Sequence, residues 1–214
     1  MAFSGWPAEA FDFFEGLEAD NTKSYWTAHK DLYERAVRSP TQALLDELER
    51  EFGAGRIFRP YRDVRFSADK SPYKENIGAV SYRPAGAVFY VALSSAGLFA
   101  ATGYYQPAAD QLDRYRRAVV AAAGEKLERI VADLERTGYE IGGEALKRAP
   151  RGYPADHPRA RLLRHKGITV ARSFAPARWM GTAKAKERVA EVWRAGGPLN
   201  KWLRSHVGAS DGEQ

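Results

Sequence analysis

Basic and aromatic side chains gather in one short stretch of the sequence, FRPYRDVRFSADKSPYK, which covers residues 58 to 74. Its basic residues are Arg59, Arg62, Arg65, Lys70 and Lys74. Only two carboxylates, Asp63 and Asp69, lie within the stretch to balance them. Guanidinium and ammonium groups bind phosphate and carboxylate oxygens, so the stretch is typical of a site for an anionic ligand. The same composition also suits contact with a nucleic acid, or ion pairs that hold the fold together.

Alternation along this stretch predicts that Arg62 lies on the apolar side of a strand, together with Val64 and Phe66. Pro60 limits the prediction, because a proline inside a strand implies an edge position or a bulge. Arg172 repeats the pattern in GITVARSF, where its neighbours on the same face are apolar. A guanidinium stays charged, so each of these arginines either has protein partners that neutralise it or lines a pocket that receives an anion.

The leading hypothesis is an arginine-lined pocket that binds a small phosphorylated or carboxylated ligand. In this hypothesis Arg62 and Arg65 hold the anion. Lys70 and Lys74 close over it, as functional loops on rigid scaffolds do, and Asp63 orients the arginines or acts as a base. The predicted ligand-binding residues are Arg59, Arg62, Arg65, Lys70, Tyr73, Lys74 and Arg172. Ser67, Asp69 and Ser71 are also ordinary turn residues, so the loop composition by itself does not require a function.

The chain has no cysteine and only four histidines, which show no recognised metal-ligand spacing. Thiolate chemistry, disulfides and cysteine-bound metals are therefore excluded, and we expect no metal. His157, at a turn bounded by prolines, is a candidate acid or base, as is Asp63. The sequence lacks a Walker pattern, a dinucleotide glycine pattern and a Gly-x-Ser-x-Gly elbow. We therefore expect no cofactor, and whether the site performs a reaction is left open.

A second basic region favours a different function, nucleic-acid binding. The formal net charge is +6, and it is unevenly spread, since residues 146 to 206 hold 15 basic against 3 acidic side chains. The alternative site is the segment 146 to 178, with Tyr153 as a stacking ring. By contrast, residues 1 to 55 hold 5 basic against 11 acidic side chains. A third hypothesis is therefore a structural or partner-binding protein in which internal ion pairs neutralise the arginines.

The elements that position these residues follow from changes of period along the chain. Helical spacing is expected after Ser4, and again from about residue 22 to 37, with Asn21 or Thr22 as the cap and an aromatic face suited to burial. A third helix is expected from Ser39 as a cap to residue 52, where an apolar stripe ends and Gly53 stops the helix. Alternation then predicts four strands between residues 56 and 105, with hairpin links that include the turn at 83 to 86. Helical spacing returns after Pro107 with a break at Gly124, and a short helix near 158 to 165, a strand at 167 to 174 and one or two last helices follow.

This order predicts an α+β fold, a single domain with a mainly antiparallel sheet of about five or six strands flanked by N-terminal and C-terminal helices. We place the domain at residues 1 to 206 and a flexible tail at 207 to 214. Of the 214 residues, 44% are hydrophobic and 28% are charged, which is typical of a globular protein. Neither a secretion leader nor a membrane span is recognisable, so we expect a cytoplasmic protein without a membrane partner.

The stretch RPYRDVRFSADKSPY resembles the signature of a bacterial protein family, domain of unknown function 2461. That signature is Arg-x-x-Arg-Asp-x-Arg-Phe, followed closely by Asp or Asn, Lys and Tyr. The matching residues are Arg59, Arg62, Asp63, Arg65, Phe66, Asp69, Lys70 and Tyr73. Similar blocks extend the resemblance over about residues 3 to 204. It implies a shared fold and a shared site, and it assigns no activity. Such proteins often carry an acidic residue where Arg161 stands, so the resemblance gives that position no role.

Overall fold

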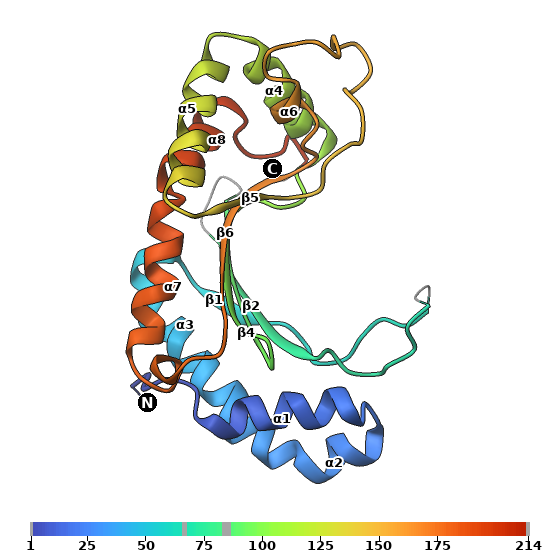
Figure 1. The fold of residues 1–214 in the computed structure, drawn as a ribbon, viewed down its shortest axis with the longest axis vertical. Coiled ribbons are helices and arrows are strands. Elements are labelled where there is room, and N and C mark those ends of the chain that lie inside the picture. The colour runs from blue at the N-terminus through green and yellow to red at the C-terminus, as the bar shows by residue number, and fades with distance from the viewer. Residues whose placement is uncertain (1, 66–67, 83–86, 213–214) are drawn as a thin grey trace. The chain divides into compact units, whose positions relative to one another are not determined.

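The computed structural model describes residues 2–65, 68–82 and 87–212 (Figure 1). It shows an α+β protein with a six-stranded antiparallel sheet, whose strand order is β1-β2-β3-β4-β6-β5. The predicted fold class is therefore confirmed. Two compact units divide the chain. Unit 1 comprises Met1–Ser81, Tyr90–Ala100 and Ser173–Ala190, and unit 2 comprises Tyr82–Phe89, Ala101–Arg172 and Glu191–Gln214.

Helices form the N-terminal part of unit 1. They are α1 (Ala8–Ala19), α2 (Lys23–Leu32), the π-helix η1 (Tyr33–Arg38) and α3 (Ser39–Phe52). Thr22 caps α2 as predicted, because its side chain accepts a hydrogen bond from the Tyr25 N–H. The predicted cap at Ser39 is wrong, since Ser39 itself is helical and η1 joins α2 to α3 without a break. Pro40 has no N–H to donate, and the wider π turn before it relieves the clash of its ring with the preceding turn.

An aromatic cluster fills the space between these helices. Phe13 meets Trp26 edge-on at 5.9 Å between ring centroids, and Trp26 contacts Tyr33 at 4.8 Å. The predicted aromatic face of the helix after residue 22 is thus buried at Trp26 and Tyr33. Trp6 is also buried, and its indole N–H donates to the Thr41 hydroxyl at 3.0 Å. Large buried rings whose polar atoms are paired stabilise this part of unit 1.

The strands are β1 (Gly55–Ile57), β2 (Asn76–Tyr82), β3 (Val88–Ser94), β4 (Gly97–Tyr104), β5 (Glu140–Gly142) and β6 (Ile168–Phe174). The strand predicted to begin at Arg56 is much shorter than expected, because β1 ends at Ile57. Pro60 explains the early end, since proline cannot donate to a strand ladder. The short strand β5, which pairs with β6, was not predicted. The predicted turn at residues 83 to 86 lies outside the described residues.

Residues 58 to 65 and 68 to 75 form two irregular segments between β1 and β2, which together we call the arm. Figure 1 shows it extending beyond the ends of these two strands. Its sides are joined by a bridge between Tyr61 and Tyr73, and the Lys74 N–H donates to the Pro60 carbonyl at 2.8 Å. We call the part around Arg65 and Ala68 the tip. The predicted position of Phe66 on the apolar face lies outside the described residues. A strand was predicted here, and most residues of the predicted site lie in the arm that the structure shows instead.

Unit 2 contains the helices α4 (Ala109–Val120), α5 (Ala123–Arg136), α6 (Ala160–Leu163) and α8 (Gly197–His206). The predicted break at Gly124 falls slightly earlier, between Val120 and Ala123. Tyr115 and Trp202 lie in the apolar core of this unit, and the Tyr115 hydroxyl donates to a backbone carbonyl of α6 at 3.0 Å. Two further helices are η2 (Arg178–Gly181) and α7 (Lys184–Ala195).

Candidate functional site

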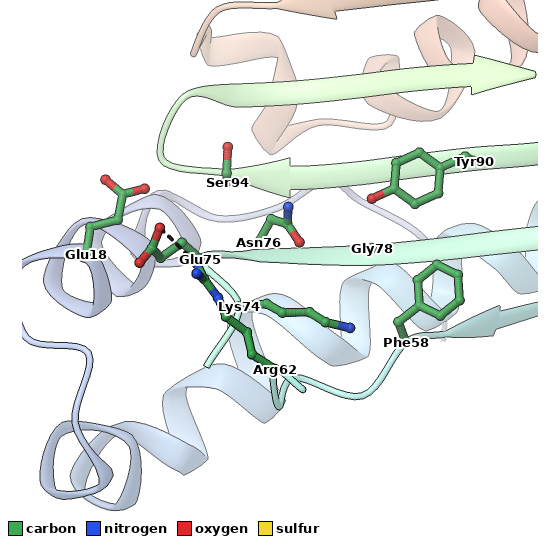
Figure 2. A pocket seen from close by; sticks show the side chains of 9 residues that line it. All are labelled: Glu18, Phe58, Arg62, Lys74, Glu75, Asn76, Gly78, Tyr90 and Ser94. Atoms are coloured by element: carbon green, nitrogen blue, oxygen red, sulfur yellow. Dashed lines mark ion pairs between the residues drawn. The ribbon is translucent and has the colours of Figure 1, made fainter. Parts of the chain in front are cut away.

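A pocket of about 560 Å³ lies in unit 1, beside the base of the arm (Figure 2). Its lining residues come from α1, the arm, β2 and β3, and they are Glu18, Phe58, Arg62, Lys74, Glu75, Asn76, Gly78, Tyr90 and Ser94. The volume lies within the range of small-molecule sites, roughly 300 to 1,000 Å³. Two acidic, two basic and two aromatic residues share the lining, so the pocket has mixed charge.

Gly78 forms part of the pocket wall on β2, and its missing side chain leaves room for two aromatic rings. A β-carbon at this position would lie 2.8 Å from the Tyr90 hydroxyl and 3.3 Å from an edge carbon of Phe58. The two rings have their centroids 6.3 Å apart. A glycine inside a strand often marks such a close approach of other groups. Gly78 therefore keeps the aromatic side of the pocket open.

Two protein carboxylates neutralise Arg62. One guanidinium nitrogen pairs with Asp69, and the other lies 3.3 Å from the Glu75 carboxylate (Figure 2). The Arg62 side chain is 27% exposed, so it is partly withdrawn from water, but it lies in an irregular segment and not on the predicted strand face. Asp69 is itself held by the Ser71 hydroxyl, which is the main reason why its pKa is lowered. Whether Arg62 also binds a ligand stays a prediction.

Lys74 is the pocket cation that no carboxylate of the described residues neutralises. Its ammonium donates to the Arg59 carbonyl at 3.0 Å and lies 5.6 Å from the centroid of the Phe58 ring. Within the described part of the chain, no carboxylate oxygen lies within 4.0 Å of it. Burial lowers the pKa of Lys74, and the charge of Arg59 lowers it further. The protonated form is thus disfavoured, and a bound anion would stabilise it.

Two other predicted residues lie nearer the arm tip and do not line the pocket. Arg65 pairs with Asp63 at 2.6 Å, with 76% and 44% of the two side chains exposed. This contact lowers the pKa of the Asp63 carboxyl, mainly through the hydrogen bond from the guanidinium. Asp63 therefore orients Arg65, while its predicted role as a base stays untested. The Lys70 ammonium donates to the Val64 carbonyl at 2.9 Å.

Tyr73 and Arg59 support the pocket from outside it. The Tyr73 ring is buried and stacks on Trp26, with centroids 4.4 Å apart and planes inclined by 6°. Asn21 holds the same residue, since its side chain exchanges two hydrogen bonds of 3.1 Å with the Tyr73 backbone. Arg59 contributes its backbone carbonyl to Lys74 and is exposed. Of the residues predicted from the sequence, the structure therefore brings only Arg62 and Lys74 into the pocket lining.

Arg172 and His157 belong to unit 2, and each has a local partner there. The Arg172 guanidinium donates to the Thr137 carbonyl at 3.0 Å and lies 4.5 Å from the centroid of the Tyr139 ring. A carboxylate was one of the expected partners of Arg172, but its observed partners are a carbonyl oxygen and the face of an aromatic ring. His157 accepts a hydrogen bond from the Arg159 N–H through Nδ1 at 3.0 Å. One ring nitrogen is therefore occupied in shaping the turn before α6.

Several cations of the basic segment 146 to 178 are paired with acidic residues. Arg161 pairs with Glu135, Lys166 pairs with Glu144, and Arg159 lies 3.5 Å from Glu125. These contacts reduce the positive charge that this segment presents, which weakens the case for nucleic-acid binding. The pairing with Glu135 also gives Arg161 a structural role. Nucleic-acid binding by this segment stays a prediction.

Sequence reasoning missed most of the pocket lining, namely Glu18, Phe58, Glu75, Asn76, Gly78, Tyr90 and Ser94. The glycine within a strand was the only signal that pointed to Gly78. Glu18 lies on a helix far away in the sequence, and nothing in its neighbourhood distinguishes it from other surface carboxylates. Across residues 2–65, 68–82 and 87–212, no group of three or more His, Asp or Glu side chains is placed to hold a metal ion.

The fold and the pocket describe an α+β protein with a mixed-charge cavity beside a basic arm. The family model described as "Conserved hypothetical protein (DUF2461)" matches residues 9–202, so the chain belongs to this family, as the resemblance implied. Searches of curated proteins and of solved structures give no match. None of the helices within the described ranges is long and apolar enough to cross a membrane.

Proposed function

We propose that unit 1 binds a small phosphorylated or carboxylated ligand in the pocket, and that Lys74 is the main contact for the anionic group. The observation that carries this proposal is the state of the Lys74 ammonium, which faces the pocket, is partly desolvated and has a carbonyl in place of a carboxylate as its partner. An ammonium in such a place gains more from an anion than one in water, because the local dielectric constant is lower.

Two further features of the lining support a small organic anion. The aromatic rings of Phe58 and Tyr90 offer apolar surface next to the Lys74 ammonium. Arg62 has five N–H donors, and its two carboxylate contacts leave others for a ligand. A phosphate monoester or carboxylate with a ring or short chain would therefore find both charge and apolar contact. The proposal concerns binding and includes no reaction.

The composition supports a cytoplasmic setting for this ligand. The chain contains no cysteine, so its stability does not depend on disulfides or on an oxidising compartment. Small phosphorylated and carboxylated metabolites are abundant solutes inside cells, and a pocket of this size matches them. We therefore infer a cytoplasmic location, in line with the expectation from the sequence.

A thermal-shift screen tests the proposal, using phosphate monoesters and carboxylates with phenyl phosphate as the reference probe. A ligand present at 100 times its dissociation constant adds about 2.7 kcal/mol of stability. For a chain of this size, that corresponds to a rise of roughly 5 °C or more in the melting temperature. Calorimetry on wild type, Lys74→Met and the control Lys30→Met then locates the site. Lys30 lies on α2, is exposed and does not line the pocket.

We expect Lys74→Met to lose binding of the stabilising anion at least tenfold, and Lys30→Met to keep it. The free energy of unfolding of both variants is measured without ligand, so that a folding defect is recognised. If no phosphate monoester or carboxylate stabilises the wild type, or if Lys74→Met binds as well as the wild type, the proposal is wrong.

A further inference from the structure

We propose that the ligand of the unit 1 pocket is zwitterionic, with an ammonium or guanidinium group that contacts Glu18 in addition to the anionic group at Lys74. This inference rests on the proposed function and specifies the class of ligand. It is drawn from the arrangement of charges in the lining, in which opposite charges without ionic partners stand at different places around one cavity.

Glu18 is the pocket carboxylate that no cation in the described part of the chain neutralises. It lies in the last turn of α1, is exposed, and accepts a hydrogen bond from the Ser95 hydroxyl. In the described portion of the chain, no Lys, Arg or His nitrogen lies within 4.0 Å of its carboxylate. A serine hydroxyl is a neutral donor, so the negative charge of Glu18 remains for a ligand to balance.

The other pocket carboxylate, Glu75, is already satisfied by the protein. Arg62 approaches one of its oxygens at 3.3 Å, and the Asn21 amide donates to the other at 3.1 Å. Arg62 also pairs with Asp69, so one guanidinium faces two carboxylates and this cluster keeps some negative charge. The lining therefore has the positive charge of Lys74 at one place and negative charge around Glu18 and Glu75 at another, and of these two carboxylates Glu18 is the one without an ionic partner among the described residues.

These two charges lie towards different ends of the lining. Figure 2 shows Glu18 at one end, near Glu75, while the Lys74 side chain runs towards Phe58 at the other end. A ligand with an anionic group only would meet Lys74 favourably and Glu18 unfavourably. A ligand with a cationic group at its far end would satisfy both side chains. Asn76 and Ser94, which also line the pocket, add neutral hydrogen-bonding groups.

The test uses two matched series of probes, alkyl phosphates and ω-aminoalkyl phosphates with two to six methylene groups. Calorimetry at low ionic strength gives the dissociation constant of each compound. Because Glu18 is exposed, its contact with an ammonium is screened by water, and we expect a gain of roughly two- to fivefold from the amine at the best chain length. The chain length at that optimum reports the separation of the two charged side chains.

The variant Glu18→Gln removes the charge with little change in shape. We expect it to abolish the gain from the amine and to leave the affinity for the alkyl phosphates unchanged or slightly higher. The matched control is Glu15→Gln, which makes the same change on the same helix at an exposed residue outside the pocket lining. We expect this control to keep most of the gain, which separates a direct contact from a general effect of charge.

The outcomes separate this inference from the proposed function. If alkyl phosphates bind and the amine adds nothing at any chain length, the zwitterion inference is wrong and the proposed function stands. The zwitterion inference is also wrong if the gain from the amine persists in Glu18→Gln. If neither series binds the wild type, the proposed function is wrong, and the inference fails with it.

Discussion

Replacing Asn21 should loosen the base of the arm from the N-terminal helices. This residue lies between α1 and α2, and its side chain makes three partly buried hydrogen bonds of 3.1 Å. Its Oδ1 accepts from the Tyr73 N–H, and its Nδ2 donates both to the Tyr73 carbonyl and to the Glu75 carboxylate. The side chain thus binds the arm as a neighbouring strand would, next to the stack of Tyr73 on Trp26.

The loss in the free energy of unfolding on replacing Asn21 can be worked out from these three hydrogen bonds. A neutral hydrogen bond contributes about 1 kcal/mol net and one to a charged group about 1.5 to 3 kcal/mol, so the three sum to about 3.5 to 5 kcal/mol. Because the groups are only partly buried, water replaces some of this, and we expect Asn21→Ala to cost about 2 to 3 kcal/mol. Asn21→Asp keeps the shape and one acceptor, but it sets an oxygen against the Tyr73 carbonyl and the Glu75 carboxylate. We expect it to destabilise at least as much as Asn21→Ala.

The assay is urea unfolding followed by circular dichroism, with the free energy of unfolding extrapolated to water. The control is Asn76→Ala, at an exposed residue of the same type at the start of β2, and it should have a small effect. Fluorescence of Trp26 should also change in the Asn21 variants, because its stacking partner moves. An Asn21→Asp protein as stable as the wild type would refute the assigned hydrogen bonds.

Three further expectations concern the pocket, the core of unit 2 and the arm tip. Gly78→Ala should weaken binding of the reference anion several-fold with little loss of stability, because the new methyl group displaces the Tyr90 hydroxyl; equal affinity in calorimetry would contradict this. Burial lowers the pKa of His165 from its ordinary 6.5. The unfolded chain then binds more protons, so stability falls as pH drops below about 6.5, and His165→Asn should flatten urea midpoints measured between about pH 7.5 and pH 5. Arg65→Ala should leave the urea midpoint unchanged, since its pair with Asp63 is exposed to solvent.

The regular elements could be predicted because their apolar residues repeat at helical or strand spacing. The buried stripe of α3 and the buried residues of β6 are examples, as are the cap at Thr22 and the stop at Gly53. The π-helix before Pro40 could not be predicted, since its residues have ordinary helical spacing and only packing decides between the two hydrogen-bond patterns. The arm was missed because alternation of exposed and half-buried residues continues past Ile57, although strand pairing does not.

The candidate site could be predicted only in part. The sequence indicated that the charge of Arg62 needs a partner. It also indicated Lys74 as one of the ligand-binding residues. It did not indicate that Asp69 and Glu75 would supply that partner, because this depends on how the arm folds back on itself. Glu18 and Tyr90 come from other elements, and their approach to the arm depends on tertiary packing. Such contacts leave no local pattern in the sequence.

The most direct measurement of the central claim is chemical-shift mapping of backbone amides during titration with phenyl phosphate. Binding in the pocket should shift the amides of Lys74, Gly78 and Tyr90 with a common dissociation constant, and Lys74→Met should abolish these shifts. Saturable shifts confined to the basic segment, for example at Lys147 and Arg164, would contradict the account. So would an absence of saturable shifts around the pocket.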